Sequence, residues 1–392
     1  MIAYDNTLLD NVYLDEEAHR LKQSGFISEE QYKSFSRQLL KLKSQNNLFI
    51  RIAFFILGCL LYSSICGFVS LLLLATNGNE YIYFFAIIGF GTKEFMSREM
   101  KYFGFGLDDA FILGAILSLS IAVSLTFDIN YDPNYLAAII VIAIASSAAY
   151  LRYLNLSLAL LACIGITGTI AYLTFEYLII GKAILPFVML LFSCICYFIS
   201  KNKLQNLSAP YYYNGLKLTK GFCLILFYLS GNYYVVRELN FSLSESYFYN
   251  GVSPEIPFVL FFWAFTISVP ALYLFFSLKN KDRIMLWIGF LALCFSVFTY
   301  KAYHHILPPE MGLTIGGLVL FAFTYFAIKK TKHNETGITF KPDRFNNPNA
   351  FANLQVLVAA SQFGLKPEVK VEESPMEFGG GGFSGGGSEG TF

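Results

Sequence analysis

The chain has 392 residues, of which 55% are hydrophobic and only 14% are charged. Because an average globular protein carries about 25% charged residues, this composition excludes a set of water-soluble domains and predicts a polytopic membrane protein. The formal net charge of +1 lacks the basic excess of nucleic-acid-binding proteins, so we expect the lipid bilayer as a partner and no nucleic acid.

The first 50 residues are mostly polar and predict a cytoplasmic helical hairpin. Asp15 is suited to cap a short first helix that ends at Gly25. Ser28 and Gln31 then have the spacing of a capping box, which predicts the start of a second helix that leads into the first membrane span.

Three residues of this second helix, Tyr32, Phe35 and Leu39, recur at helical spacing and predict one apolar face. Two interpretations fit such a face. It docks a soluble cytoplasmic protein partner, or it belongs to a lid that lies against the membrane and stabilises the fold.

Uncharged runs long enough to cross a bilayer recur after residue 50. They cover residues 52–75, 110–127, 133–151, 153–175, 183–200, 221–236, 256–278, 284–300 and 311–328. A further run, residues 81–92, is short for a span, although a helix there can extend toward Met96.

The distribution of basic residues favours counting the short run as a span. With the N-terminus in the cytoplasm and ten spans, the outer connections contain only Lys182, Arg237 and Lys301. The inner connections then contain Lys93, Arg98, Lys101, Arg152, Lys201, Lys203, Lys217, Lys220, Lys279, Lys281 and Arg283. This asymmetry obeys the positive-inside rule. We therefore expect an all-α bundle of about ten transmembrane helices over residues 51–329, with both termini in the cytoplasm.

After the last predicted span the chain becomes polar again. Residues 330–377 predict a cytoplasmic tail with one short helix near residues 354–360. Residues 378–392 are rich in glycine and predict disorder, because they cannot bury enough surface to offset the entropy of ordering.

The segment LKQSGFISEEQ at residues 21–31, followed by an amphipathic helix and many spans, resembles a family of bacterial multi-pass membrane proteins of unknown function. In that family a short helical hairpin precedes the membrane region. The glycine- and phenylalanine-rich tail is also similar to the tails of several bacterial envelope proteins. The resemblance implies a location in the bacterial cytoplasmic (inner) membrane and assigns no catalytic residue.

The spans as drawn contain no ionisable residue, which disfavours proton-coupled and ion-coupled carriers. Asp108 and Asp109 are interpreted as helix caps, and Glu94 as a helical partner of Arg98. Pro270 lies inside a span and predicts a kink, which is either a hinge or a packed bend.

One polar cluster, formed by Lys301, His304, His305 and Glu310, is a candidate for proton transfer or metal binding. Adjacent histidines diverge by about 100° on a helix and no third ligand is evident, so we expect no metal, no cofactor and interfacial histidines. The seven cysteines lie in apolar runs and are expected to be free thiols.

No nucleotide-binding, serine-hydrolase or zinc-protease motif is present. We therefore expect a non-enzymatic integral membrane protein whose cytoplasmic ends contact partners. The alternative is a transporter of an apolar or weakly polar small solute, built from five plus five helices.

Overall fold

The computed structural model of the chain describes residues 2–23, 26–45, 47–73, 81–127, 134–177, 181–206, 210–242 and 255–303, with scattered positions between 314 and 329. In this part of the chain the fold is all-helical, as predicted, and the β contact seen there is a single bridge between Lys43 and Tyr102. The helices are α1 (Asn6–Gln23), α2 (Glu29–Gln38), α3 (Leu48–Leu73), α4 (Ile82–Arg98), α5 (Leu107–Thr126), α6 (Tyr135–Tyr153), α7 (Leu156–Tyr177), α8 (Gly181–Gln205), the 3₁₀ turn η2 (Pro210–Tyr212), α9 (Tyr213–Gly231), α10 (Tyr233–Ser242), α11 (Val259–Asn280) and α12 (Arg283–Tyr303).

Seven of these helices are long and apolar enough to cross a membrane, namely α3, α5, α6, α7, α8, α11 and α12. Helix α4 extends past the predicted end, as far as Arg98, but its 17 residues make it only about 25 Å long. Helix α9 carries Lys217 and Lys220 in its first half. The predicted span at residues 311–328 lies mostly outside the described residues, and residues 330–377 and 378–392 lie wholly outside them.

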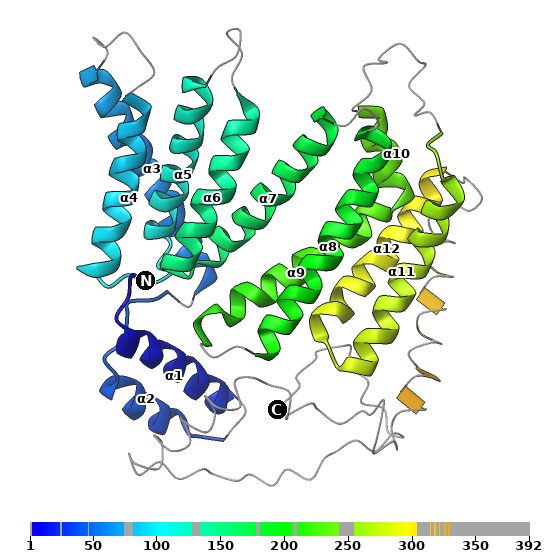
Figure 1. Cartoon of the computed structure of the whole chain (residues 1–392). Helices are drawn as coiled ribbons and strands as arrows, with labels where there is room; N and C mark the ends of the chain where they lie inside the picture. Colours follow the sequence, from blue (N-terminus) through cyan, green and yellow to red (C-terminus); the bar gives the residue numbers. More distant parts are fainter. Residues whose placement is uncertain are drawn as a thin grey trace.

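The bundle has two groups of helices joined by α7 (Figure 1). In the N-terminal half, helices α3–α6, α5 packs against α3, α4 and α6. In the C-terminal half, helices α8–α12, α9 packs against α8, α11 and α12. Helix α7 contacts α6 on one side and both α8 and α9 on the other.

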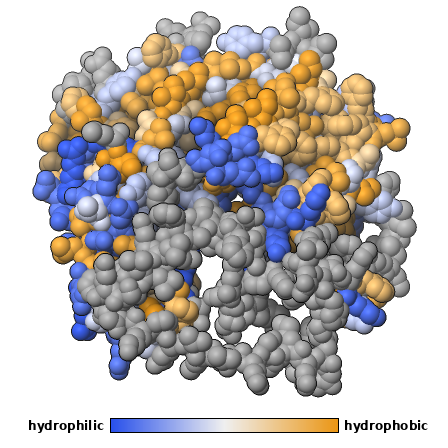
Figure 2. All heavy atoms as spheres, turned by 60° about the horizontal axis from the view of Figure 1, so that its bottom comes forward, coloured by the Kyte–Doolittle hydropathy of each residue, from blue (hydrophilic) through white to orange (hydrophobic). Residues whose placement is uncertain are grey.

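The sides of the bundle are apolar, as expected of helices in lipid. Leu60 on α3 and Leu260 on α11 are 61% and 85% exposed. Figure 2 shows hydrophobic residues over the flank of the bundle, and hydrophilic residues on the hairpin and the neighbouring helix ends. These apolar helices fit a bilayer environment, and all seven cysteines are free thiols.

Glycine lets helices of the N-terminal half approach closely. A methyl group on Gly89 of α4 would lie 2.6 Å from the Ala115 side chain of α5, and one on Gly165 of α7 would lie 2.8 Å from the Ala143 backbone of α6. Such short separations are typical of helices that associate within lipid, where packing rather than water exclusion holds them together.

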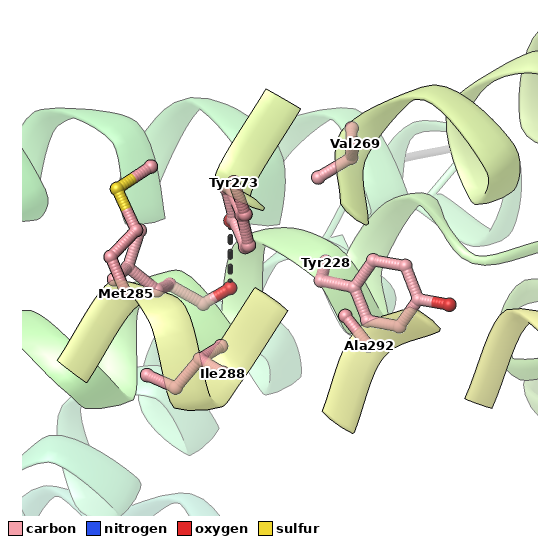
Figure 3. Close-up of a cluster of buried hydrophobic side chains, with 7 residues drawn as sticks. Tyr228, Val269, Tyr273, Met285, Ile288 and Ala292 are labelled. Carbon is pink, nitrogen blue, oxygen red and sulfur yellow. Dashed lines mark hydrogen bonds between the residues drawn. The ribbon is translucent and has the colours of Figure 1, made fainter. Parts of the chain in front are cut away.

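The C-terminal half has an aromatic core between α9, α11 and α12 (Figure 3). Tyr273 on α11 donates a hydrogen bond to the carbonyl oxygen of Leu224 on α9, at 2.9 Å. Pro270 is buried inside α11 and cannot donate to the carbonyl of Thr266 one turn earlier. The Ser296 hydroxyl from α12 donates to that carbonyl at 2.6 Å, so a neighbouring helix bonds the carbonyl that the proline leaves without a helical donor.

The structure corrects the prediction of a single span over residues 221–236. Helix α9 ends at Gly231 and α10 begins at Tyr233. The fully buried Asn232 lies at the break, where its side chain bonds the Tyr228 hydroxyl at 3.0 Å and the Thr299 hydroxyl at 3.2 Å. These bonds from α12 and α9 satisfy a polar group at a place where the sequence reads as continuous apolar helix.

The N-terminal hairpin forms, with two corrections. Its capping box is confirmed, because the Ser28 side chain accepts from Gln31 and the Gln31 side chain accepts from the Ser28 backbone. Asp15 lies inside α1 rather than at its start, and Gly25 falls outside the described residues. Helix α2 ends at Gln38, so a non-helical segment separates it from α3.

Candidate functional site

Only one member of the polar cluster predicted at the end of α12 lies within the described residues. Lys301 is exposed in the last turn of this helix, and His304, His305 and Glu310 lie outside the described residues. Across the part of the chain that the structure describes, no group of three or more histidine, cysteine, aspartate and glutamate side chains is arranged to hold a metal ion.

The apolar face of α2 is occupied by its own hairpin. Phe35 is buried to 1% exposure against Ala18 of α1, and Tyr32 and Leu39 are half-buried against the same cluster. The capped turn at Ile27 closes this cluster. The residues suggested for docking a soluble partner therefore form the interior of the hairpin.

Charged residues instead gather where α4, α5 and α6 end beside the hairpin, which we call the hairpin end of the bundle. Lys93 on α4 is 1% exposed and Asp108 on α5 is fully buried, and their Nζ and Oδ2 atoms are 2.6 Å apart. The other carboxylate oxygen of Asp108 accepts from the backbone N–H groups of Phe105 and Gly106 at 3.0 and 3.1 Å. The N-cap residue of α5 is Gly106 and has no side-chain cap, so Asp108 is not the helix cap that was predicted. It lies in the first turn of α5, where it binds the loop before the helix and forms half of a buried ion pair.

The neighbouring Asp109 links three parts of the chain. Its Oδ2 atom is 2.5 Å from the guanidinium of Arg51 at the start of α3. Its Oδ1 atom accepts from the side-chain amide of Asn155 at 2.5 Å, at the junction of α6 and α7. One carboxylate thus connects α3, α5 and the α6–α7 junction.

A third carboxylate, Glu94, connects α4 to α6. It accepts from the Arg152 guanidinium at 2.5 and 3.1 Å and from the Tyr153 hydroxyl at 2.8 Å. The predicted pair with Arg98 also forms, at 2.5 Å. The ring of Tyr153 lies 5.1 Å below the Lys93 ammonium, so the two parts of the network touch.

A glycine-containing loop brings Arg51 to this network. Gly106 has φ +105°, and a methyl group there would lie 2.3 Å from the carbonyl oxygen of Arg51. Gly104 has φ +60° beside the Arg51 guanidinium. Only glycine adopts the first geometry without strain, so the loop needs it for α3 to approach α5.

The beginning of the chain covers the ion pair. The Ala3 N–H donates to the carbonyl of Arg152 at 2.9 Å, and Tyr4 is buried beside Lys93. Burial raises the pKa of the Tyr4 hydroxyl, against the opposing effect of the Lys93 charge. Ser97 lies close enough to the Tyr4 hydroxyl to lower this pKa, although neither buried hydroxyl makes a hydrogen bond of good geometry among the described residues.

Helix α1 lies across the joint between the two halves of the bundle. Its Leu9 is fully buried in a cluster with Leu154 of the N-terminal half and with Tyr211 before α9. Asp10 accepts from the Tyr211 hydroxyl at 2.5 Å. The halves also touch beneath α1, since the Tyr212 hydroxyl donates to the Leu151 carbonyl at 3.2 Å.

The charged residues at the hairpin end hold helices together through ion pairs. Each of the charged groups Arg51, Lys93, Asp108 and Asp109 has an opposite charge within bonding distance. A reactive group would need an available base or nucleophile, whereas these charges neutralise one another in a buried setting. Together they fix the relative positions of α3, α4, α5 and the α6–α7 junction at the hairpin end.

Sequence reasoning did not identify Lys93 and Asp108 as a pair. The predicted uncharged run ends at residue 92 because Lys93 carries a charge. The observed helix continues past it and includes the apolar residues Phe95 and Met96. The sequence does carry a signal for this pair. It consists of a lysine inside a continuing apolar pattern and an aspartate in the first turn of the next helix.

Comparison of the chain with known proteins gives no match to a family model, to a curated protein or to a solved structure.

Proposed function

We propose that this protein is a non-enzymatic carrier of a small apolar or weakly polar solute in the cytoplasmic membrane of a bacterium, and that its N-terminal hairpin is an intramolecular clamp. In this proposal both termini are cytoplasmic, about ten helices cross the membrane, and the hairpin holds the cytoplasmic ends of the two halves together. Release of the hairpin then lets the halves move relative to each other.

The observation that supports the clamp is the position of α1. Leu9 packs against residues from both halves, and Asp10 bonds the segment that leads into α9. A segment that only stabilised one half would have no reason to reach the second. Motion of one group of helices against another is the usual basis of alternating access in carriers.

The network beneath α1 favours a clamp that opens. Tyr4 and Ser97 bury hydroxyl groups that interact with each other but form no hydrogen bond of good geometry in the described structure, and a buried polar group left poorly satisfied costs up to about 1–3 kcal/mol. This cost is recovered when the N-terminal segment leaves and water reaches both groups. Apolar packing around Leu9 therefore stabilises the closed state, and the desolvation of the Tyr4 hydroxyl destabilises it.

Basic residues support a cytoplasmic hairpin end. Arg51, Lys93, Arg152 and Lys220 all lie at the hairpin end of their helices and pair there with carboxylates. An excess of lysine and arginine on one side is typical of the cytoplasmic face. A reporter fused at Tyr131 tests this orientation, because it should report the outside of the cell.

The clamp is tested with Leu9→Asp, which places a charge in the fully buried cluster under α1. The matched control is Leu40→Asp, because Leu40 is 79% exposed in the same part of the chain. In a protein that keeps Cys163 alone of its cysteines, we expect a water-soluble maleimide to label Cys163 at least fivefold faster in Leu9→Asp, and at the original rate in Leu40→Asp. Equal rates in all three proteins would show that the hairpin does not control access between α7 and α9.

Transport is tested separately in proteoliposomes, with glycerol as the first of a panel of small uncharged solutes. We expect protein-dependent uptake that Leu9→Asp changes at least threefold and Leu40→Asp leaves unaltered. Uptake no faster than in empty liposomes, for the whole panel and all three proteins, would reject the carrier while leaving the clamp to be judged by labelling.

A second candidate function is a cytoplasmic docking platform, now on the outer face of α2. Glu29, Glu30, Lys33 and Arg37 are exposed there and carry both signs of charge. Deleting residues 1–46 distinguishes the two functions. If the deletion abolishes the function of the protein in cells but leaves solute uptake in proteoliposomes unchanged, the platform is favoured over the clamp.

A further inference from the structure

An open apolar groove lies on the flank of the bundle where α7, α9 and α12 meet. Its volume is about 420 Å³, within the roughly 300–1,000 Å³ of small-molecule sites. Leu156 and Leu160 of α7 form one wall, Ile284 and Ile288 of α12 form the other, and α9 forms the floor. Among the lining residues, Leu156 follows Asn155 of the charged network directly, so this end of the groove borders the hairpin end of the bundle.

The floor of the groove is formed by α9 around Gly221. A methyl group on Gly221 would lie in ordinary contact with the side chains of Ile284 and Ile288, at 3.4 and 3.7 Å. Behind it, Ile288 is buried in the aromatic core with Tyr228 and Tyr273, so the groove has a rigid back (Figure 3). The floor and one wall of the groove therefore belong to the packed C-terminal half, and α7 supplies the other wall.

The lining is apolar along its length and positive at one end. Leu160 and Ile225 are 41% and 45% exposed, although both lie in apolar helices. Lys217 also lines the groove, one turn closer to the hairpin end than Gly221. The adjacent Lys220 is neutralised by Asp282, whereas Lys217 forms no ion pair among the described residues.

We propose that this groove binds one acyl chain of an anionic glycerophospholipid, with Lys217 at the phosphate of the headgroup. An apolar channel open to the side of the bundle is accessible from the bilayer, and a lysine at its end lies at the level of the headgroups. A basic residue between transmembrane helices on the cytoplasmic side is a typical contact for an anionic lipid. The net negative charge of the lipid complements Lys217, which distinguishes this occupant from a zwitterionic lipid or an apolar helix.

The test is native mass spectrometry of the full-length protein, purified in detergent and incubated with dioleoyl phosphatidylglycerol or dioleoyl phosphatidylcholine. We expect one retained phosphatidylglycerol, and retention about fivefold weaker in Lys217→Gln, which is the effect of one basic residue near a headgroup. The matched control is Lys203→Gln, at the same end of α8 but outside the groove, and it should bind as the original protein does.

A second variant fills the groove without changing its charge. Ile225→Trp should abolish the retained lipid, whereas Ile195→Trp, on a similarly exposed position of α8, should not. Both variants must keep the helix content and monodispersity of the original protein. Equal retention of the two lipids, unchanged binding in both Lys217→Gln and Ile225→Trp, or a dimer that only Ile225→Trp dissociates would each overturn the proposal.

Discussion

Removing one partner of the buried ion pair should destabilise the protein far more than removing both. Asp108→Asn keeps an oxygen that can accept from the backbone N–H groups of Phe105 and Gly106, so these bonds survive while the negative charge is lost. The Lys93 ammonium, 1% exposed, then loses its closest counter-charge. Breaking a buried pair in this way costs about 3–5 kcal/mol.

Lys93→Met should be the milder change. It leaves Asp108 charged, but this carboxylate still accepts two backbone N–H bonds and lies in the first turn of α5, where the helix dipole favours a negative charge. We expect a loss of about 2–3 kcal/mol, since charge-assisted bonds of this kind contribute about 1.5–3 kcal/mol. The double variant removes both charges and should lie within about 2 kcal/mol of the original protein.

The assay is the free energy of unfolding from a detergent titration in mixed micelles, followed by the fluorescence of Trp263 and Trp287. Arg98→Gln is the control, because its side chain is 60% exposed and its pair with Glu94 should contribute no more than about 0.5 kcal/mol. A double variant as unstable as the sum of the two single variants would show that Lys93 and Asp108 are not coupled, and would refute the reasoning.

Three further predictions concern a loop, a helix break and a pH effect. Gly106→Ala should cost about 1–3 kcal/mol of unfolding free energy because of backbone strain and contact with Arg51, whereas Gly91→Ala, with no atom within 4 Å, should be neutral or stabilising; the opposite order would contradict the loop geometry. Asn232→Ala leaves its buried partners unsatisfied and should cost about 1–3 kcal/mol in the same titration; an unchanged midpoint would argue against the network at the break between α9 and α10. Burial raises the pKa of Glu17 in α1 above its ordinary 4.5, so folding favours its protonated form, and the stability this provides is present below pH 4.5 and lost as the pH rises through the raised pKa. Glu17→Gln should therefore raise the thermal midpoint relative to the original protein at pH 7 and lose that advantage at pH 4.5, and a pH-independent difference would disprove this assignment.

Features set by composition or by neighbouring residues could be predicted from the sequence. The excess of apolar residues indicates the all-helical membrane class, and the seven apolar helices follow directly from uncharged runs. The capping box at Ser28 and Gln31 is equally local, because both of its bonds lie within four residues. Such features need no knowledge of the tertiary fold.

Features made by contacts between helices could not be predicted in this way. Lys93 and Asp108 are 15 residues apart and belong to different helices, so each resembles an ordinary charge at a helix end. Asn232 breaks an apolar run because Thr299 and Tyr228 bond its side chain. The periodicity of Phe35 shows that one face of α2 is buried, but it does not show whether lipid, a partner or α1 covers that face.

The position of α1 also constrains how the protein is made. Asp10 bonds Tyr211, which is 201 residues later in the chain. At about 5–20 residues per second, the ribosome supplies this partner only about 10–40 s after α1 has emerged. The hairpin can close on itself at once through Phe35 and Ala18, but the cluster around Leu9 stays incomplete until the seven further helices α2–α8 and then Tyr211 have been synthesised. The completion of α1 docking is therefore a late event in biogenesis, because it requires residues of the N-terminal half and the segment that follows α8.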